Sequence, residues 1–100
     1  MTSKMFQGAR TFDGVVVTVN GQPLDPRRDL KRFSDNHFEW GYEGDESRQL
    51  ALAIIAECSG DESALRHAES FMREIVANFS NEWEMSDKNI AAAINAIDEL

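Results

Sequence analysis

The stretch from Phe38 to Gly60 is the feature that most constrains how this chain can fold. It joins a short aromatic segment to a run from Leu50 to Ala56 in which no residue is polar. A helix containing that run is apolar on nearly every side, whereas a helix on the outside of a small domain carries a single apolar stripe. The sequence therefore predicts that this helix is central and that the rest of the chain covers it.

Local signals give the two ends of the central helix. Asp45 or Ser47 is expected to cap its first turn, because short polar side chains accept hydrogen bonds from the free amides there. The helix is expected to end near Cys58, with Gly60 as its C-terminal stop.

Two further helices are predicted after Gly60. The second opens at residues 61–63 and has an apolar stripe at three- and four-residue steps, formed by Ala64, Leu65, Ala68, Phe71, Met72, Ile75, Val76 and Phe79. The third is capped by Ser86 and runs through Leu100, with inward-facing Ile90, Ala93, Ile94 and Ile97. Between the two helices, Trp83 and Met85 flank Glu84 in a brief extended segment.

The first part of the chain is predicted to form β-strands. Lys4–Thr11 and Val15–Val19 indicate two strands around a turn, and the second is almost entirely β-branched. Asn20-Gly21 is typical of a tight hairpin turn, so a short third strand is expected at Gln22–Leu24, with Pro23 at an edge.

The segment His37–Tyr42 alternates between aromatic and polar residues. Phe38, Trp40 and Tyr42 alternate with His37 and Glu39, a period of two that predicts a half-buried strand. The expected fold is therefore α+β in a single domain of residues 1–100. A small antiparallel sheet of three to four strands over residues 4–42 packs on a three-helix part over residues 45–100.

A basic segment, Pro26–Phe33, lies between these regions. Its basic residues are Arg27, Arg28, Lys31 and Arg32. As a short helix they would share one face and favour an anion site. The interleaved Asp25 and Asp29 favour a solvated connector instead.

Composition indicates a folded protein in a reducing compartment. Apolar residues make up 42% of the chain and charged residues 28%, and Cys58 is the sole cysteine, so no internal disulfide is expected. Met1–Met5 lacks the apolar core of a signal peptide, and no apolar run approaches the roughly 20 residues that span a bilayer. We expect a cytoplasmic protein without membrane contact.

The net charge of −8 is unevenly distributed. Residues 1–36 carry six bases and four acids, and residues 37–100 carry four bases and fourteen acids, a net charge of −10. An acidic field repels nucleic acid and attracts basic proteins, although acidic helix faces also serve solubility alone. The candidate contact residues for a basic protein partner are Glu43, Asp45, Glu46, Asp61, Glu62, Glu69, Glu82 and Glu84.

No motif for catalysis or for a cofactor is present. His37, His67, Glu39 and Glu43 lack zinc-ligand spacing, and Gly41 and Gly44 do not complete a phosphate loop. A Cys58–His67 nucleophile pair is an alternative to a buried structural cysteine. We therefore expect no metal and no cofactor.

Several segments together resemble a known family. These are D-G-V-V-V-T-V-N-G-Q-P-L, L-K-R-F-S, F-E-W-G-Y-E-G and Q-L-A-L-A. They are similar to a family of bacterial, archaeal and phage proteins of unknown function and about this length, in which W-G-Y is followed by G-S-G-P-A-Q-L-A-L-A. Trp40-Gly41-Tyr42, Gly44, Gln49–Ala53 and Trp83 match that pattern, whereas residues 45–48 depart from it. The resemblance implies no activity, and its occurrence in phages favours a role in a host cytoplasm.

Three functional hypotheses follow from the sequence. The first is a non-catalytic inhibitor, phage or mobile-element encoded, that binds a basic nucleic-acid-binding host protein such as a CRISPR or other defence complex. The second is a structural or regulatory module that forms a homodimer or docks through Trp40 and Tyr42. The third is an enzyme, which would require a cleft gathering His37, Glu39 and Arg48.

Overall fold

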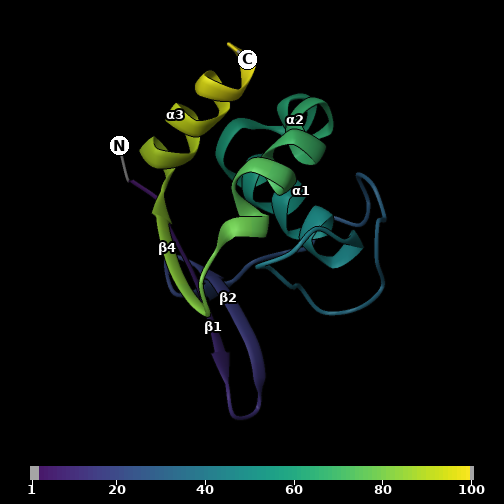
Figure 1. Cartoon of the computed structure of the whole chain (residues 1–100), viewed down its shortest axis with the longest axis vertical. Helices are drawn as coiled ribbons and strands as arrows, with labels where there is room; N and C mark the ends of the chain where they lie inside the picture. The colour runs from purple at the N-terminus through teal and green to yellow at the C-terminus, as the bar shows by residue number, and fades with distance from the viewer. Residues whose placement is uncertain (1–2, 100) are drawn as a thin grey trace.

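A four-stranded antiparallel sheet forms one part of the fold. In the computed structural model, which describes residues 3–99, its strands are β1 (Met5–Thr11), β2 (Gly14–Val19), β3 (Gln22–Pro23) and β4 (Glu82–Ser86). Their order is β3-β2-β1-β4, so β3 and β4 are the two edges. The turn of the β1–β2 hairpin projects away from the helices (Figure 1). The predictions of the hairpin and of a short third strand are confirmed.

Three helices form the other part. They are α1 (Asp45–Ser59), α2 (Asp61–Glu74) and α3 (Asp87–Asp98), and a 3-10 turn, η1 (Val76–Asn78), follows α2. The expected α+β arrangement is thus confirmed. Ser86 caps α3 as predicted, because its hydroxyl accepts from the Asn89 amide while the Asn89 side chain accepts from the Ser86 amide. The predicted end of this helix at Leu100 lies outside the described residues.

The core is built around α1. All seven residues from Leu50 to Ala56 are buried, which confirms that this helix is central. Gly60, with φ of 94°, stops α1 as expected and leads directly into α2. The apolar stripe of α2 faces α1 and the core, except for Leu65, which is 51% exposed. The stripe was expected to continue as helix to Phe79, but α2 ends at Glu74.

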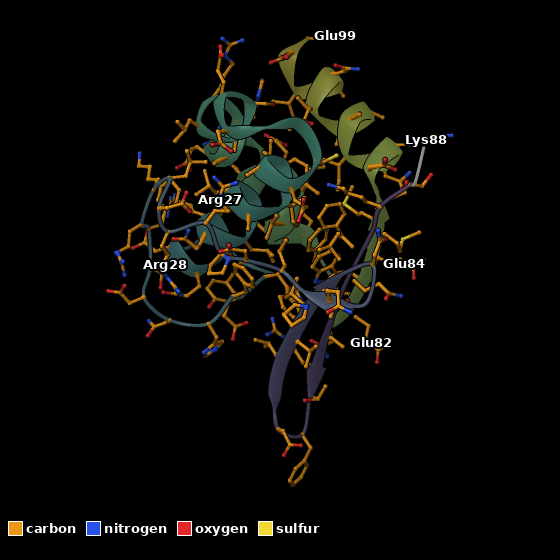
Figure 2. All side chains as sticks on the ribbon, turned by 180° about the vertical axis from the view of Figure 1, so that it is seen from behind. Arg27, Arg28, Glu82, Glu84, Lys88 and Glu99 are labelled. Carbon is orange, nitrogen blue, oxygen red and sulfur yellow. The ribbon has the colours of Figure 1, made fainter. Side chains whose placement is uncertain are left out.

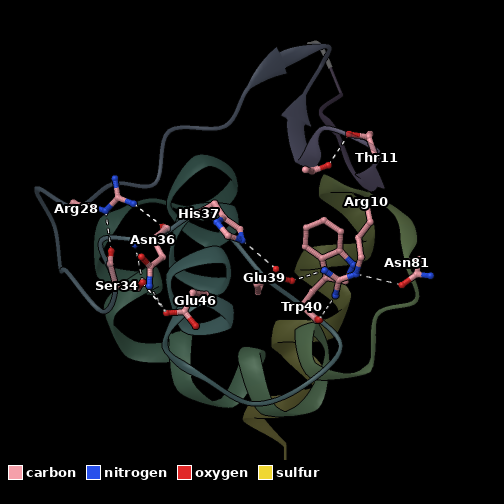
Figure 3. A network of polar contacts seen from close by, with 11 residues as sticks. Arg10, Thr11, Arg28, Ser34, Asn36, His37, Glu39, Trp40, Glu46 and Asn81 are labelled. Carbon is pink, nitrogen blue, oxygen red and sulfur yellow. Dashed lines mark hydrogen bonds and ion pairs between the residues drawn. The ribbon is translucent and has the colours of Figure 1, made fainter.

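Residues 37–42 do not form the predicted strand. Their backbone is held by side-chain and loop contacts, because the Arg10 guanidinium donates to the Trp40 carbonyl at 2.6 Å and also pairs with Glu39 (Figure 3). The Gly41 amide donates to the Val76 carbonyl at 3.0 Å. The Trp40 carbonyl and the Gly41 amide are therefore bound by groups outside any strand pair. The fourth strand is instead β4, the segment expected to be briefly extended.

The cap predicted for α1 is also different. Gly44 occupies the N-cap position without a side-chain cap. The Ser47 hydroxyl donates to the Tyr42 carbonyl at 2.8 Å, and the Asp45 carboxylate lies 3.0 Å from Arg48. Both side chains are therefore used to hold the preceding loop or to pair with a base.

A buried glutamine attaches the basic segment to α1. Gln49 accepts hydrogen bonds from the amides of Phe33 (2.7 Å) and Ser34 (3.2 Å) and donates to the carbonyls of Pro26 (2.7 Å) and Lys31 (3.0 Å). The segment contains a turn but no helix, and Gln49 binds three of its backbone groups. No helix within residues 3–99 has the length and apolar character that crossing a membrane requires.

Candidate protein-binding surface

The sheet buries one face and exposes the other. On β1, Phe6 and Gly8 are buried while Gln7 is exposed, and on β2, Val17 is buried while Val16 is 48% exposed. This alternation follows from the period of two along each strand. We call the exposed side the outer sheet face, and it consists of Gln7, Ala9, Val16, Thr18, Glu82 and Glu84.

The strand register arranges the outer sheet face in two rows. Gln7 lies between Thr18 and Glu84, and Ala9 lies between Val16 and Glu82. Gln7 and Ala9 on β1 occupy the centre, Val16 and Thr18 occupy the β2 side, and the two glutamates occupy the β4 side. The same residues, with the backbone of Gly8 and Trp83, line an open hollow of about 580 Å³. A hollow that is partly apolar, at Ala9 and Val16, and has carboxylates at one border suits a side chain that is part apolar and part basic.

Glu82 and Glu84 differ from most other candidate acids because they have no ion-pair partner within residues 3–99. Glu84 accepts a hydrogen bond from the Gln7 amide at 2.8 Å, and neither glutamate forms an ion pair within residues 3–99. Figure 2 shows both along β4, on the other side of the view from Arg27 and Arg28. Their negative charges are therefore not neutralised by an ion pair with a base within residues 3–99.

Four of the eight candidate acids are held in ion pairs with arginines. Arg48 binds Glu69 at 2.7 Å and Asp45 at 3.0 Å. The other two pairs are Arg27–Asp61 at 3.2 Å and Arg66–Glu62 at 3.3 Å. The hydrogen bond from Arg48 lowers the pKa of Glu69. These pairs reduce the charge that helices α1 and α2 can offer to a partner.

The remaining two acids have different surroundings. The Glu46 carboxylate accepts from the Ser34 hydroxyl at 2.8 Å and from the Asn36 amide at 3.4 Å, and these bonds lower the pKa of Glu46 (Figure 3). Glu46 therefore helps to fold the loop. Glu43 is exposed and lies in the loop before α1, away from the sheet residues in the sequence. The eight acids thus do not form one group.

Trp40 and Tyr42, the aromatic pair proposed as a contact site from the sequence, differ in their burial. Trp40 is fully buried, its indole nitrogen donates to the Ser80 carbonyl at 2.9 Å, and its ring packs edge-to-face on Trp83. The expectation that Trp40 forms a contact surface is therefore wrong, because an alternating pattern cannot tell a surface from a core face. Tyr42 is 48% exposed and remains available.

A different aromatic residue is fully exposed. Phe12 lies in the turn between β1 and β2, and its relative exposure is 106%. In the sequence, Phe12 lies in the turn predicted between the first two strands. The available signal was the residue type, because tight hairpin turns favour glycine, asparagine and aspartate over a large apolar side chain.

The alternative catalytic groupings are not assembled. The Cys58 thiol contacts the Asp87 carbonyl at 3.6 Å, and burial raises the pKa of Cys58, which disfavours a reactive thiolate. His67 instead contacts Asp98 at 2.7 Å and the Ser63 carbonyl at 3.1 Å, and so links α2 to α3. The proposed Cys58–His67 pair is therefore absent from the described part of the chain.

The enzyme hypothesis required a cleft that gathers His37, Glu39 and Arg48. His37 and Glu39 are in contact at 3.2 Å, but Glu39 is also paired with Arg10, and Arg48 is occupied by two acids of α1 and α2. Burial alone would raise the pKa of Glu39, but hydrogen bonds from Arg10 and His37 outweigh it and lower that pKa. Within residues 3–99, no three or more His, Cys, Asp or Glu side chains gather as metal ligands would.

The basic segment likewise lacks a free anion site. Arg27 binds Asp29 and Asp61, and Arg28 donates to the carbonyls of Ser34 (2.8 Å) and Asn36 (2.9 Å). Arg32 pairs with Asp35. These arginines hold the connector together, in agreement with the alternative in which its bases offset nearby acids.

Comparisons with known proteins give a family and no activity. No curated protein and no solved structure matches the chain. One family model, described as a family of unknown function (DUF6166), matches residues 6–96. Because this match covers nearly the whole chain, the protein belongs to the DUF6166 family.

Proposed function

We propose that the protein is a non-catalytic cytoplasmic module that binds a basic protein through its outer sheet face. The observation that carries this proposal is the contrast between two groups of acids. Glu82 and Glu84 border an open hollow and have no basic partner within residues 3–99, whereas four other candidate acids are paired with arginines of the chain. A surface with unneutralised carboxylates attracts a partner of opposite charge.

The class of partner follows from the same chemistry. Basic side chains that can meet two neighbouring carboxylates are abundant in nucleic-acid-binding proteins, where they otherwise contact phosphates. Binding would block such a surface and inhibit the partner, and a phage-encoded inhibitor of a host defence complex is one form of this function. Ion pairing on α1 and α2 favours a narrow acidic contact at β4 over an extended surface that imitates DNA.

The test is a pull-down from lysate of the source cell with the tagged protein. The wild type is compared with Glu82→Gln/Glu84→Gln and with a control, Glu74→Gln/Glu99→Gln, which removes the same charge from exposed positions at the C-terminal ends of α2 and α3. We expect a basic protein that elutes with salt and is captured by the wild type and the control but not by the β4 variant. Equal capture by all three folded proteins would refute the proposed surface.

A second candidate function rests on Phe12. A fully exposed aromatic side chain at the end of a projecting hairpin is suited to insertion into an apolar pocket of a partner. This is the docking-module hypothesis with Phe12 in place of Trp40. It predicts salt-tolerant binding that is lost in Phe12→Ser, and salt-sensitive binding that is retained in Phe12→Ser would exclude it.

A further inference from the structure

The hydrogen bonds at the two ends of the β1–β4 pair determine which backbone groups of β4 point outward. The Arg10 amide donates to the Asn81 carbonyl at 3.3 Å, and the Asp87 amide donates to the Lys4 carbonyl at 3.0 Å. In an antiparallel pair, the residues that exchange such bonds alternate along each strand. Trp83 and Met85 therefore bond to β1, and the backbone groups of Glu82 and Glu84 point away from it.

These outward groups form an open edge. Within residues 3–99, no hydrogen bond occupies the amide or the carbonyl of Glu82 or Glu84 on the side away from β1. The edge ends at Ser86, whose amide is bound by the Asn89 side chain at 3.0 Å. The opposite edge is less suited to receive a strand, because β3 has two residues and one is Pro23, which has no amide hydrogen.

Side chains on this edge carry the same sign of charge. Glu82 and Glu84 are two residues apart, so both side chains lie on the outer sheet face. A strand added beside β4 places alternate residues directly opposite these two glutamates, on the same face. Basic residues at those alternate positions would form cross-strand pairs with them.

We propose that β4 accepts, by strand addition, an extended segment of the partner with lysine or arginine at every second residue. This proposal rests on the proposed function and adds its mode of binding. Backbone hydrogen bonds to Glu82 and Glu84 supply affinity, and the two carboxylates select the alternating basic side chains.

A second copy of this chain does not fit the same edge. Antiparallel pairing of two β4 strands centred on this edge places Glu82 opposite Glu84, or Glu84 opposite itself. Like charges directly opposite each other destabilise a strand pair. Charge complementarity therefore favours a basic partner over a homodimer through β4.

The experiment uses three synthetic peptides of equal charge and the full-length protein. The first alternates lysine with valine. The second has the same sequence but N-methyl groups on the lysine amides, the donors that would face β4 when the peptide pairs antiparallel to it. The third has the same composition with its lysines in one continuous run. Affinity is measured by titration calorimetry, and the β4 amides are followed by NMR hydrogen exchange with and without peptide.

We expect the alternating peptide to bind and to slow exchange of the Glu82 and Glu84 amides. N-methylation removes the two backbone bonds to the Glu82 and Glu84 carbonyls and should weaken binding by about tenfold or more. The peptide with its lysines in one run should also bind more weakly. Successive side chains of a strand point to opposite faces, so every second lysine of the run would point away from the carboxylates. Binding should weaken for Glu82→Gln/Glu84→Gln and persist for Glu74→Gln/Glu99→Gln.

Two results would overturn strand addition. Equal affinities for the three peptides, without protection of the edge amides, would leave a charged surface but no added strand. Absence of binding by the alternating peptide would reject this mode, while the lysate comparison decides the proposed function separately. Equal affinity of both glutamine variants for the alternating peptide would reject the selection by Glu82 and Glu84.

Discussion

The indole of Trp83 lies directly over Gly8 on the neighbouring strand. The two residues are paired in the β1–β4 register, and a Cβ atom at Gly8 would lie 2.2 Å from the Trp83 indole nitrogen. The ring also stacks on Phe79, at 4.4 Å between centroids, and meets Trp40 edge-to-face. Gly8 thus provides the space in which the aromatic group that anchors β4 to the core can lie.

Gly8→Ala should therefore destabilise the protein. The added methyl group must displace the Trp83 ring from Phe79 and Trp40, and overpacking of this kind costs about 1–3 kcal/mol. The free energy of unfolding is measured by urea titration with tryptophan fluorescence. Ala9→Ser, on the exposed face of the same strand, is the control and should change stability little. Wild-type stability in Gly8→Ala would show that the ring is not confined by β1.

Trp40 and Tyr42 should respond differently to truncation. Trp40→Ala removes a fully buried ring and its hydrogen bond to Ser80, so we expect a loss of about 3–5 kcal/mol in the free energy of unfolding. Tyr42→Ala removes a half-exposed side chain and should cost less than about 1 kcal/mol. Thermal unfolding followed by circular dichroism compares them, and similar losses would contradict the assignment of Trp40 to the core.

Replacement of Gln49 should release the connector from α1. Gln49→Leu keeps a similar volume but removes the partners of the Phe33 amide and of the Pro26 and Lys31 carbonyls. Each buried group without a partner costs about 1–3 kcal/mol, so we expect a total loss of at least about 2 kcal/mol. Limited proteolysis should show faster cleavage within residues 26–36.

The matched control for this variant is Gln22→Leu, an exposed glutamine on β3. Its free energy of unfolding and its rate of proteolytic cleavage should equal those of the wild type. Unchanged proteolysis in Gln49→Leu would mean that other contacts, such as those of Arg28, suffice to hold the connector.

Stability should fall in acid because of Glu46 and Glu69. Hydrogen bonds from Ser34 and from Arg48 lower the pKa values of these two carboxyls below the usual 4.5. The unfolded chain therefore binds protons first as the pH falls. Their contribution is complete above about pH 5 and is lost as the pH drops through the lowered values.

Melting temperatures between pH 7 and pH 3 measure this effect. The wild type should lose stability below about pH 5, where the unfolded carboxyls begin to bind protons. Glu46→Gln should show a smaller loss over this range, and Glu99→Gln should follow the wild-type curve. Parallel curves for Glu46→Gln and the wild type would contradict the role of the Ser34 hydrogen bond.

Only part of the candidate surface could be inferred from the sequence. Glu82 and Glu84 were among the acids expected to contact a partner, but nothing in the sequence separated them from Asp61 or Glu69. The difference arises because each of those two acids meets an arginine that is 21 or more residues away in the chain. Gln7 and Val16 join the surface only through strand pairing.

The sequence by itself determined the elements whose cause is local. Seven successive apolar residues predict a buried helix, a β-branched run before Asn20-Gly21 predicts a hairpin, and Ser86 predicts the cap of α3. Only the tertiary structure decided that residues 37–42 are not a strand and that β4 lies at an edge. Those outcomes depend on which distant group satisfies each backbone amide and carbonyl, and no local pattern specifies that partner.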